Sequence, residues 1–344
     1  MASSERRKGQ SIGIDYVIGI AIFVIAISTG IIYTTGSYVP DNGLSENIGS
    51  LTSNSIANFK SNTQWEVYKN PLIVENDYKL TNYPITLNYS FNENLDSSST
   101  FLKYGDSKKP TYVSQDRRKV YFVSDVSKKE KFNLFWTENT NLSDPEESDT
   151  LDINNKQIKN NLIEVNFTQN GVSNLEYKGK QFLNNSLGMN VSSDPSIKDK
   201  EIIAQINYSN GREIEIFDNA SSMYIGSLSE NQLWIMNFSN YFTSLYSSSD
   251  SSNYDISGSG TLYSGTSNWI DLYNQTGISI IGENIGYTVS KTGQNSEIRV
   301  ELDIPEATDK LELYMHEGNY TEAENRKRAF YKPPNITIGF KETM

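Results

Sequence analysis

The longest apolar run of the chain lies near its N-terminus. From Tyr16 through Tyr38 no side chain carries a charge. This length matches the roughly 20 apolar residues that a helix needs to cross a hydrocarbon core of about 30 Å. We therefore predict a hydrophobic membrane-spanning helix within residues 10–38, with the chain after it outside the cell, because basic residues precede it. This basic head consists of Arg6, Arg7 and Lys8.

A break and a weaker helical pattern follow. Pro40 and Gly43 belong to a cluster of turn residues that ends or bends the first helix. Apolar residues then recur every three to five positions within 39–62, which predicts a connecting helical segment. These apolar residues are Leu44, Ile48, Leu51, Ile56 and Phe59.

From about Trp65 the hydrophobic period changes to two, which is typical of strands with one buried and one solvated face. Asn170-Gly171 and Asn210-Gly211 are the dipeptides of tight hairpin turns, and Lys178-Gly179 and Thr292-Gly293 indicate further turns. The Ser- and Gly-rich stretch 247–267 predicts an exposed loop. Strands are expected at 65–69, 84–90, 119–124, 131–137, 162–168, 201–208, 213–217, 232–238, 297–304, 310–316 and 335–340.

These patterns predict a mainly β protein in which an N-terminal hydrophobic α-helix is followed by an antiparallel β-sandwich head. We expect one β-sandwich over residues 63–155 and a larger one over 156–344. Whether the two form one domain or two stays open at this point.

Composition narrows the function. The net charge of −12 gives no basic surface for a nucleic-acid backbone, so no nucleic-acid partner is expected. The absence of cysteine excludes disulfides, thiolate metal sites and cysteine nucleophiles, and a single histidine excludes His-rich metal sites. We expect a protein that is not an enzyme, with no catalytic or metal-binding residues and no cofactor.

The residues ahead of the apolar run carry a more specific signal. Arg7-Lys8-Gly9-Gln10-Ser11 resembles the archaeal class III, or prepilin-type, signal peptide. The resemblance implies residues 1–9 as signal peptide and a prepilin peptidase that cuts between Gly9 and Gln10. An ordinary signal peptide would instead need small residues after the apolar run, where Ser28-Thr29-Gly30 matches weakly. The third alternative is that the segment is a membrane anchor that is not cleaved.

The resemblance to archaeal type IV pilin-like surface proteins covers about the first sixty residues. It implies that the helix of residues 10–38 is a stalk that packs in the membrane or a filament against other pilin-like subunits. In that family an acidic residue near the mature N-terminus pairs with a free amine, here Asp15 with Gln10. Asp15 would be the sixth mature residue, whereas the family usually has the acid fifth, and a boundary position in the headgroups is the alternative.

A second resemblance lies in the middle of the chain. Residues 105–138 and 160–185 resemble the β-sandwich and galactose-mutarotase-like supersandwich that follow the catalytic domain of α-mannosidase-type glycosidases. It implies an architecture and no activity.

Asn-x-Ser/Thr sequons are spread over the exported part of the chain, where N-glycosylation is expected on a polar β surface. They begin at Asn88, Asn141, Asn166, Asn184, Asn190, Asn207, Asn219, Asn237, Asn274, Asn319 and Asn335.

Ordinary structural roles are expected for several other side chains. His316 follows an alternating apolar set, which predicts a solvent-facing strand residue rather than a general base. The tryptophans Trp65, Trp136, Trp234 and Trp269 favour core packing over stacking on sugars. An acidic patch lacks the order of a calcium loop and predicts a solvated loop instead. The patch consists of Asp144, Glu146, Glu147, Asp149 and Asp152.

The sequence thus predicts an extracellular pilin-like subunit with a structural or adhesive role, located at the cell membrane and cell surface. Its expected partners are the prepilin peptidase, the membrane and other pilin-like subunits, with surface glycans as a candidate ligand of the head. The alternative is a membrane-anchored carbohydrate-binding or carbohydrate-active surface protein.

Overall fold

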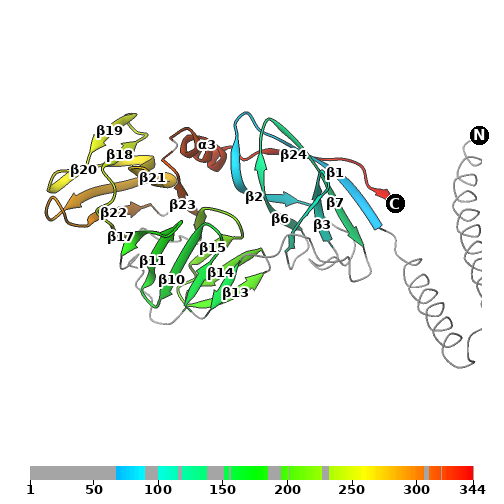
Figure 1. Ribbon diagram of the computed structural model, residues 1–344, viewed down its shortest axis with the longest axis horizontal. Helices are drawn as coiled ribbons and strands as arrows, with labels where there is room; N and C mark the ends of the chain where they lie inside the picture. The colour runs from blue at the N-terminus through cyan, green and yellow to red at the C-terminus, as the bar shows by residue number, and fades with distance from the viewer. Residues whose placement is uncertain are drawn as a thin grey trace, which may run out of the picture. The chain divides into compact units, whose positions relative to one another are not determined.

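The computed structural model describes residues 67–89, 100–114, 118–137, 151–154, 156–184, 195–200, 202–226, 232–305, 310–318 and 320–343 (Figure 1). The expected signal peptide, the helix of 10–38 and the connecting segment 39–62 lie outside these residues. Residues 66–344 form one compact unit. The described part is mainly β, as expected, and its paired strands are antiparallel, as in the pairing of β1 with β7 and of β20 with β21.

The first part of the unit consists of two sheets that share one core. Strand order is β24-β1-β7-β3-β4 in one sheet, with β25 also paired to β1, and β2-β6-β5 in the other. Leu72 of β1 and Leu134 of β7 face Phe122 of β6 in the same hydrophobic cluster. The strands are β1 (Val67–Glu75), β2 (Leu80–Asn88), β3 (Thr100–Tyr104), β4 (Ser107–Lys109), β5 (Tyr112–Val113), β6 (Lys119–Val126), β7 (Lys129–Thr137), β24 (Asn335–Ile338) and β25 (Glu342–Thr343).

The C-terminal strands belong to this first sandwich. Leu72 pairs with Ile338 and Glu75 with Asn335, and β25 continues along the same edge of β1. The expected boundary assigned residues 335–343 to the larger sandwich. These residues instead pair with β1, a strand that precedes them by more than 250 positions in the sequence. Local sequence patterns do not encode such a distant contact.

The rest of the unit is one large sheet. Its strand order is β13-β14-β15-β16-β23-β21-β22-β17-β12-β11-β10-β9-β8, with β20 paired to β21 and β18 paired to both β19 and β20. Its strands are β8 (Asp152–Asn154), β9 (Gln157–Lys159), β10 (Ile163–Thr168), β11 (Gly171–Tyr177), β12 (Lys180–Asn184), β13 (Ser196–Lys200), β14 (Ile203–Asn207), β15 (Glu213–Phe217), β16 (Ser222–Gly226), β17 (Gln232–Phe238), β18 (Ser244–Ser247), β19 (Ser252–Asp255), β20 (Gly260–Tyr273), β21 (Gly277–Lys291), β22 (Ile298–Ile304) and β23 (Lys310–His316).

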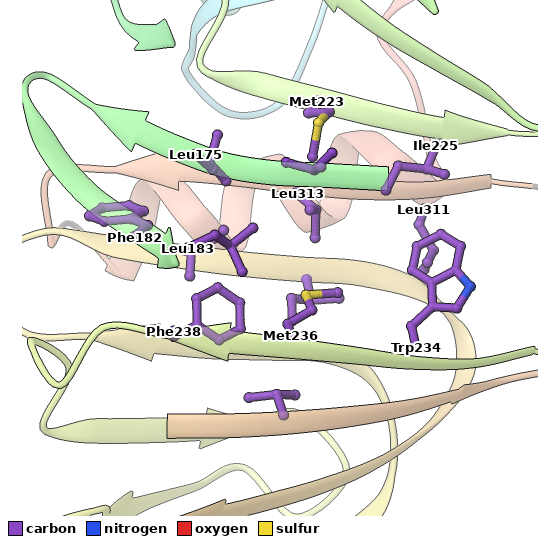
Figure 2. Packing of buried hydrophobic residues seen from close by; sticks show 14 of the residues in the cluster. Leu175, Phe182, Leu183, Met223, Ile225, Trp234, Met236, Phe238, Leu311 and Leu313 are labelled. Carbon is purple, nitrogen blue, oxygen red and sulfur yellow. The ribbon is translucent and has the colours of Figure 1, made fainter. Parts of the chain in front are cut away.

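This large sheet bends around its main hydrophobic cluster. Figure 2 shows Trp234, Met236 and Phe238 of β17 across from Leu175 of β11 and Leu313 of β23. These strands are not all neighbours in the sheet, so its two halves must face each other across the core. Burial of this apolar surface is the main stabilising contribution to the large sheet.

Tight turns fix the register of several hairpins. Lys178 and Gly179 both have positive φ, 49° and 75°, as a type I′ turn requires, and they join β11 directly to β12. Gly211 also has a positive φ, 83°, in the turn between β14 and β15. The predicted turns at these two positions are confirmed.

The Ser- and Gly-rich stretch 247–267 is not the predicted loop. It contains β19 and the first half of β20, and Ser247 and Ser267 are buried at 0% and 4% exposure. The hydroxyls of Ser248 and Ser267 lie 3.0 Å apart, so serines satisfy one another where apolar residues would be expected. The Ser- and Gly-rich composition of this stretch therefore predicted a loop where the structure has strands.

A helix, α3 (Tyr320–Tyr331), was not predicted. Its buried residues are Ala323, Arg326 and Ala329, which have helical spacing but are small or charged, so no apolar stripe marks the helix in the sequence. No helix within the described residues is long and apolar enough to cross a membrane.

Candidate functional site: a pocket around His316

Three adjacent strands bring together one histidine, one aspartate and one serine. In the pairing of β20 with β21, Asp271 lies opposite Ser279, and in the pairing of β21 with β23, Gly277 lies opposite His316. The antiparallel register therefore places three polar side chains from distant parts of the sequence in one region of the large sheet.

These side chains form a buried hydrogen-bonded set. His316 Nε2 lies 2.9 Å from Asp271 Oδ1, and Ser279 Oγ donates to the same oxygen over 3.0 Å. None of the three residues is more than 2% exposed. With the proton of a neutral imidazole on Nε2, Nδ1 is left as an acceptor, and it has no hydrogen-bond partner among the described residues. Because Ser279 bonds to the carboxylate and not to the imidazole, the set lacks the order of a Ser-His-Asp triad.

Gly277 makes room for the imidazole. A Cβ atom at this position would lie 2.4 Å from Cε1 and 2.5 Å from Nε2 of His316. On the same strand as His316, Tyr314 stacks with it at a ring-centroid distance of 5.8 Å. The histidine is thus held between the backbone of one strand and an aromatic ring.

A pocket of about 540 Å³ opens beside this set. Asp271 and His316 line it together with Tyr246, Tyr273 and Glu324. The volume falls within the roughly 300–1,000 Å³ typical of small-molecule sites. The site thus combines a spacious cavity with several polar groups that lie along one wall.

Two of the tyrosines that line the pocket, Tyr246 and Tyr320, belong to an aromatic cluster with Trp269. Tyr246, Trp269 and Tyr320 contact one another at ring-centroid distances of 4.8, 5.0 and 5.4 Å. Tyr246 and Trp269 are buried, whereas Tyr320, the first residue of α3, is 40% exposed. Burial and the neighbouring Tyr246 raise the pKa of the Tyr320 hydroxyl, so this hydroxyl stays protonated at neutral pH.

The prediction that His316 faces solvent is wrong. Its strand β23 lies between β16 and β21 inside the large sheet, and every residue from Leu311 to His316 is buried. Both faces of this strand are covered, so alternation along it does not separate inside from outside.

The prediction that the tryptophans pack in the core is confirmed for the three that the structure describes. Trp136, Trp234 and Trp269 are at most 1% exposed and pack in the hydrophobic clusters, and Trp65 lies outside the described residues. Of the acidic patch only Asp152 is described, and it is exposed. Among the described residues there is no group of three or more His, Cys, Asp or Glu that could hold a metal ion.

The sequons fall into distinct environments. Asn88, Asn274 and Asn335 are exposed, whereas Asn166, Asn207, Asn219 and Asn237 are half-buried. The side chains of the remaining sequon asparagines lie outside the described residues, namely Asn141, Asn184, Asn190 and Asn319. The predicted N-terminal sites also lie outside them, namely Arg6, Arg7, Lys8, Gly9, Gln10 and Asp15.

A second cavity, of about 670 Å³, lies where the first sandwich, α3 and the large sheet meet. Glu215, Tyr224, Lys310 and Glu312 of the large sheet line it, opposite Leu87 of β2. Lys310 Nζ lies 3.8 Å from the ring centroid of Tyr224. Burial raises the pKa of the Glu215 carboxyl, and the positive charge of Lys310 acts against that rise.

Sequence reasoning missed the partners of His316. Asp271 stands in the apolar stretch Trp269-Ile270-Asp271-Leu272, and a carboxylate among such neighbours is a usable signal of a buried, paired acid. Tyr320 and Glu324 had no signal, because the helix that positions them was itself not predicted.

No family model matches the chain, and no curated protein matches it. Among solved structures, an α-mannosidase from Enterococcus faecalis V583 is similar with a TM-score of 0.43 and 10% identity, over 80% of this chain and 46% of that chain. A glycosyl hydrolase family 38 protein from Enterococcus faecalis has a TM-score of 0.44 and 11% identity, over 80% of this chain and 47% of that chain. The chain thus spans about half the length of either protein.

Proposed function

We propose that this chain is a pilin-like surface subunit, with a hydrophobic N-terminal helix for membrane anchoring and assembly and a β head outside the cell. The observation that carries the proposal is Arg7-Lys8-Gly9-Gln10 a few residues ahead of the uncharged run Tyr16–Tyr38. A cut before the apolar segment keeps that segment in the mature chain, where it is available to pack against the same segment of other subunits. An ordinary signal peptide would be lost together with its apolar run.

The described part of the chain is compatible with such a head. Residues 66–344 form one compact β unit, which follows the proposed stalk and connecting segment in the sequence. The expected partners are a prepilin peptidase, the membrane and further pilin-like subunits. A structural or adhesive role requires no catalytic residues.

Processing tests this proposal directly. N-terminal sequencing of the native protein should begin at Gln10, and Gly9→Val should block the cut while the protein still enters the membrane. A native start at Met1, at Ala2 or near Gly30 would contradict the pilin-like reading.

Assembly provides a second test. If Asp15 neutralises the amine of Gln10 within a helix bundle, Asp15→Ala leaves that amine unpaired at a cost of about 3–5 kcal/mol. The yield of crosslinked oligomers or filaments should then fall at matched membrane levels. Asp15→Glu keeps the charge and is the matched control. Undiminished assembly of Asp15→Ala would remove the pairing from the proposal.

A second candidate function is that of a membrane-anchored carbohydrate-binding protein. It has the same N-terminal membrane anchor as the proposed pilin-like subunit, but its β head would bind a carbohydrate. The observation in its favour is the pocket around His316, where tyrosine rings and carboxylates line one cavity.

A further inference from the structure

We propose that the pocket around His316 binds a neutral saccharide, as the ligand site of an adhesive head. This inference rests on the adhesive role within the proposed function. It assigns a ligand class and the residues that recognise it.

Tyrosine rings provide the apolar part of such a site. Tyr246, Tyr273 and Tyr320 line the pocket, and the ring of Tyr320 is supported by contacts with Tyr246 and Trp269. Tyr320 nevertheless keeps 40% of its surface exposed, whereas Tyr246 and Trp269 are buried. A sugar ring has flat C–H faces that can cover this exposed aromatic surface, while its hydroxyls point away toward polar groups.

Polar groups with complementary hydrogen-bonding capacity face the same cavity. Asp271 Oδ1 is occupied by His316 and Ser279, and neither of these bonds involves Oδ2. Asn253 accepts from the Tyr273 hydroxyl over 3.0 Å through its carbonyl oxygen, which leaves its amide NH₂ group as a donor. A sugar hydroxyl both donates and accepts, so it can bond to a carboxylate and to an amide at once.

The acceptor of the site is held in place before a ligand arrives. Because Ser279 and His316 both bond to Oδ1, the carboxylate of Asp271 cannot rotate freely. Because only 1% of its surface is exposed, Asp271 offers a ligand a small contact area, and the larger contact area is the exposed ring of Tyr320. A preorganised acceptor lowers the entropic cost of binding a polar ligand.

Charge selects among saccharides. Asp271 and Glu324 line the pocket, and no lysine or arginine is among the described residues that do so. Two basic side chains of α3 have contacts of their own: Arg328 bonds to Glu324 over 2.7 Å, and Lys327 lies over the ring of Trp269 at 5.3 Å. Arg328 offsets the charge of Glu324, and no lysine or arginine is paired with Asp271 among the described residues. The Asp271 carboxylate therefore disfavours an anionic ligand, so the site favours neutral saccharides over those with uronic or sialic acids.

The test is binding of the full-length chain, in detergent, to an array of neutral and acidic oligosaccharides, followed by titration with the best neutral one. We expect neutral saccharides to bind and acidic ones not to bind. Tyr320→Ala should weaken binding about tenfold, and Tyr320→Phe should retain most of it because the ring remains. Tyr104→Ala is the matched control, since Tyr104 is 41% exposed and does not line this pocket.

Three outcomes would overturn the inference: no binding to any neutral saccharide, preferential binding of acidic ones, or equal affinity of the wild type and Tyr320→Ala. Thermal unfolding of each variant shows that it is folded. The proposed pilin-like function is tested separately: it fails if N-terminal sequencing finds a start other than Gln10. Saccharide binding by a chain that starts elsewhere would keep this inference as the second candidate function.

Discussion

Arg326 and Glu312 form a buried ion pair in which Nε lies 2.6 Å from Oε1 and each side chain is 2% exposed. The same guanidinium donates to Ser222 and Tyr224 of β16 and lies 4.5 Å from the ring centroid of Tyr83 of β2. Burial disfavours its charge, but the carboxylate of Glu312 and the surrounding tyrosine hydroxyls together outweigh burial and hold the pKa of Arg326 above its usual range. One side chain thus connects α3, the large sheet and the first sandwich.

Removing one partner of this pair should be costly. Arg326→Met leaves the Glu312 carboxylate buried without its cation, and we expect a loss of about 3–5 kcal/mol in the free energy of unfolding. The double variant Arg326→Met/Glu312→Leu should be more stable than Arg326→Met alone, because it buries no unpaired charge. Urea denaturation of the three proteins measures both effects.

Arg328 provides the matched control. On the same helix it bonds to Glu324 over 2.7 Å, but the two side chains are 53% and 32% exposed. Arg328→Met should therefore cost less than about 1 kcal/mol. An equal loss in Arg326→Met and Arg328→Met would show that burial does not set the strength of these pairs.

Gly277 should be essential for the position of His316. In Gly277→Ala the new methyl group would overlap the imidazole, and we expect a loss of about 1–3 kcal/mol together with a displaced ring. Since His316 is the only histidine, its imidazole NMR signals report the displacement without assignment. Gly293→Ala has no atom within 4 Å of the new Cβ and should change stability by less than about 0.5 kcal/mol. Unchanged imidazole signals in Gly277→Ala would refute the close contact.

Strands with one wet face were predictable from sequence. Ile298, Val300, Leu302 and Ile304 are all buried in β22 while Arg299 and Asp303 are exposed, as the alternation predicted. Period-two patterns specify which face is inside whenever the other face meets water.

The candidate site depends on features that such patterns do not encode. β23 is covered on both faces, so Glu312 and His316 looked like exterior residues although both are buried. Asp271 and His316 are 45 positions apart and meet only because β21 lies between their strands. The position of α3 depends on a buried arginine instead of an apolar stripe, and only the folded structure reveals the partner of that arginine.

Glycosylation should follow the exposure of each sequon. Asn88 and Asn335 are exposed and should carry glycans, whereas Asn207 should not, because its Nδ2 atom, to which a glycan would be attached, is buried. Mass spectrometry of peptides from the native protein measures occupancy at each position. Asn88→Gln and Asn335→Gln should each reduce the intact mass by one glycan, and Asn207→Gln should leave glycan mass unchanged. A glycan on Asn207 would contradict the prediction.

The carboxyl of Glu215 should make stability depend on pH. Its pKa in the folded protein is raised by burial, so the folded state binds more protons than the unfolded state in the window above the ordinary glutamate pKa. The associated stabilisation is complete below that ordinary value and is lost as the pH rises through the raised one. Glu215→Gln cannot ionise and should lack this loss.

The difference in unfolding free energy between Glu215→Gln and the wild type isolates this group, because other titrating side chains cancel. It should be small at low pH, then rise in favour of the variant as the wild-type carboxyl ionises. Lys310 acts against the rise in the pKa of Glu215, so Lys310→Met should move the window to higher pH. Urea titrations across the range from pH 4 to pH 8 measure both shifts. A difference that does not change with pH would mean that Glu215 ionises alike in the folded and unfolded states.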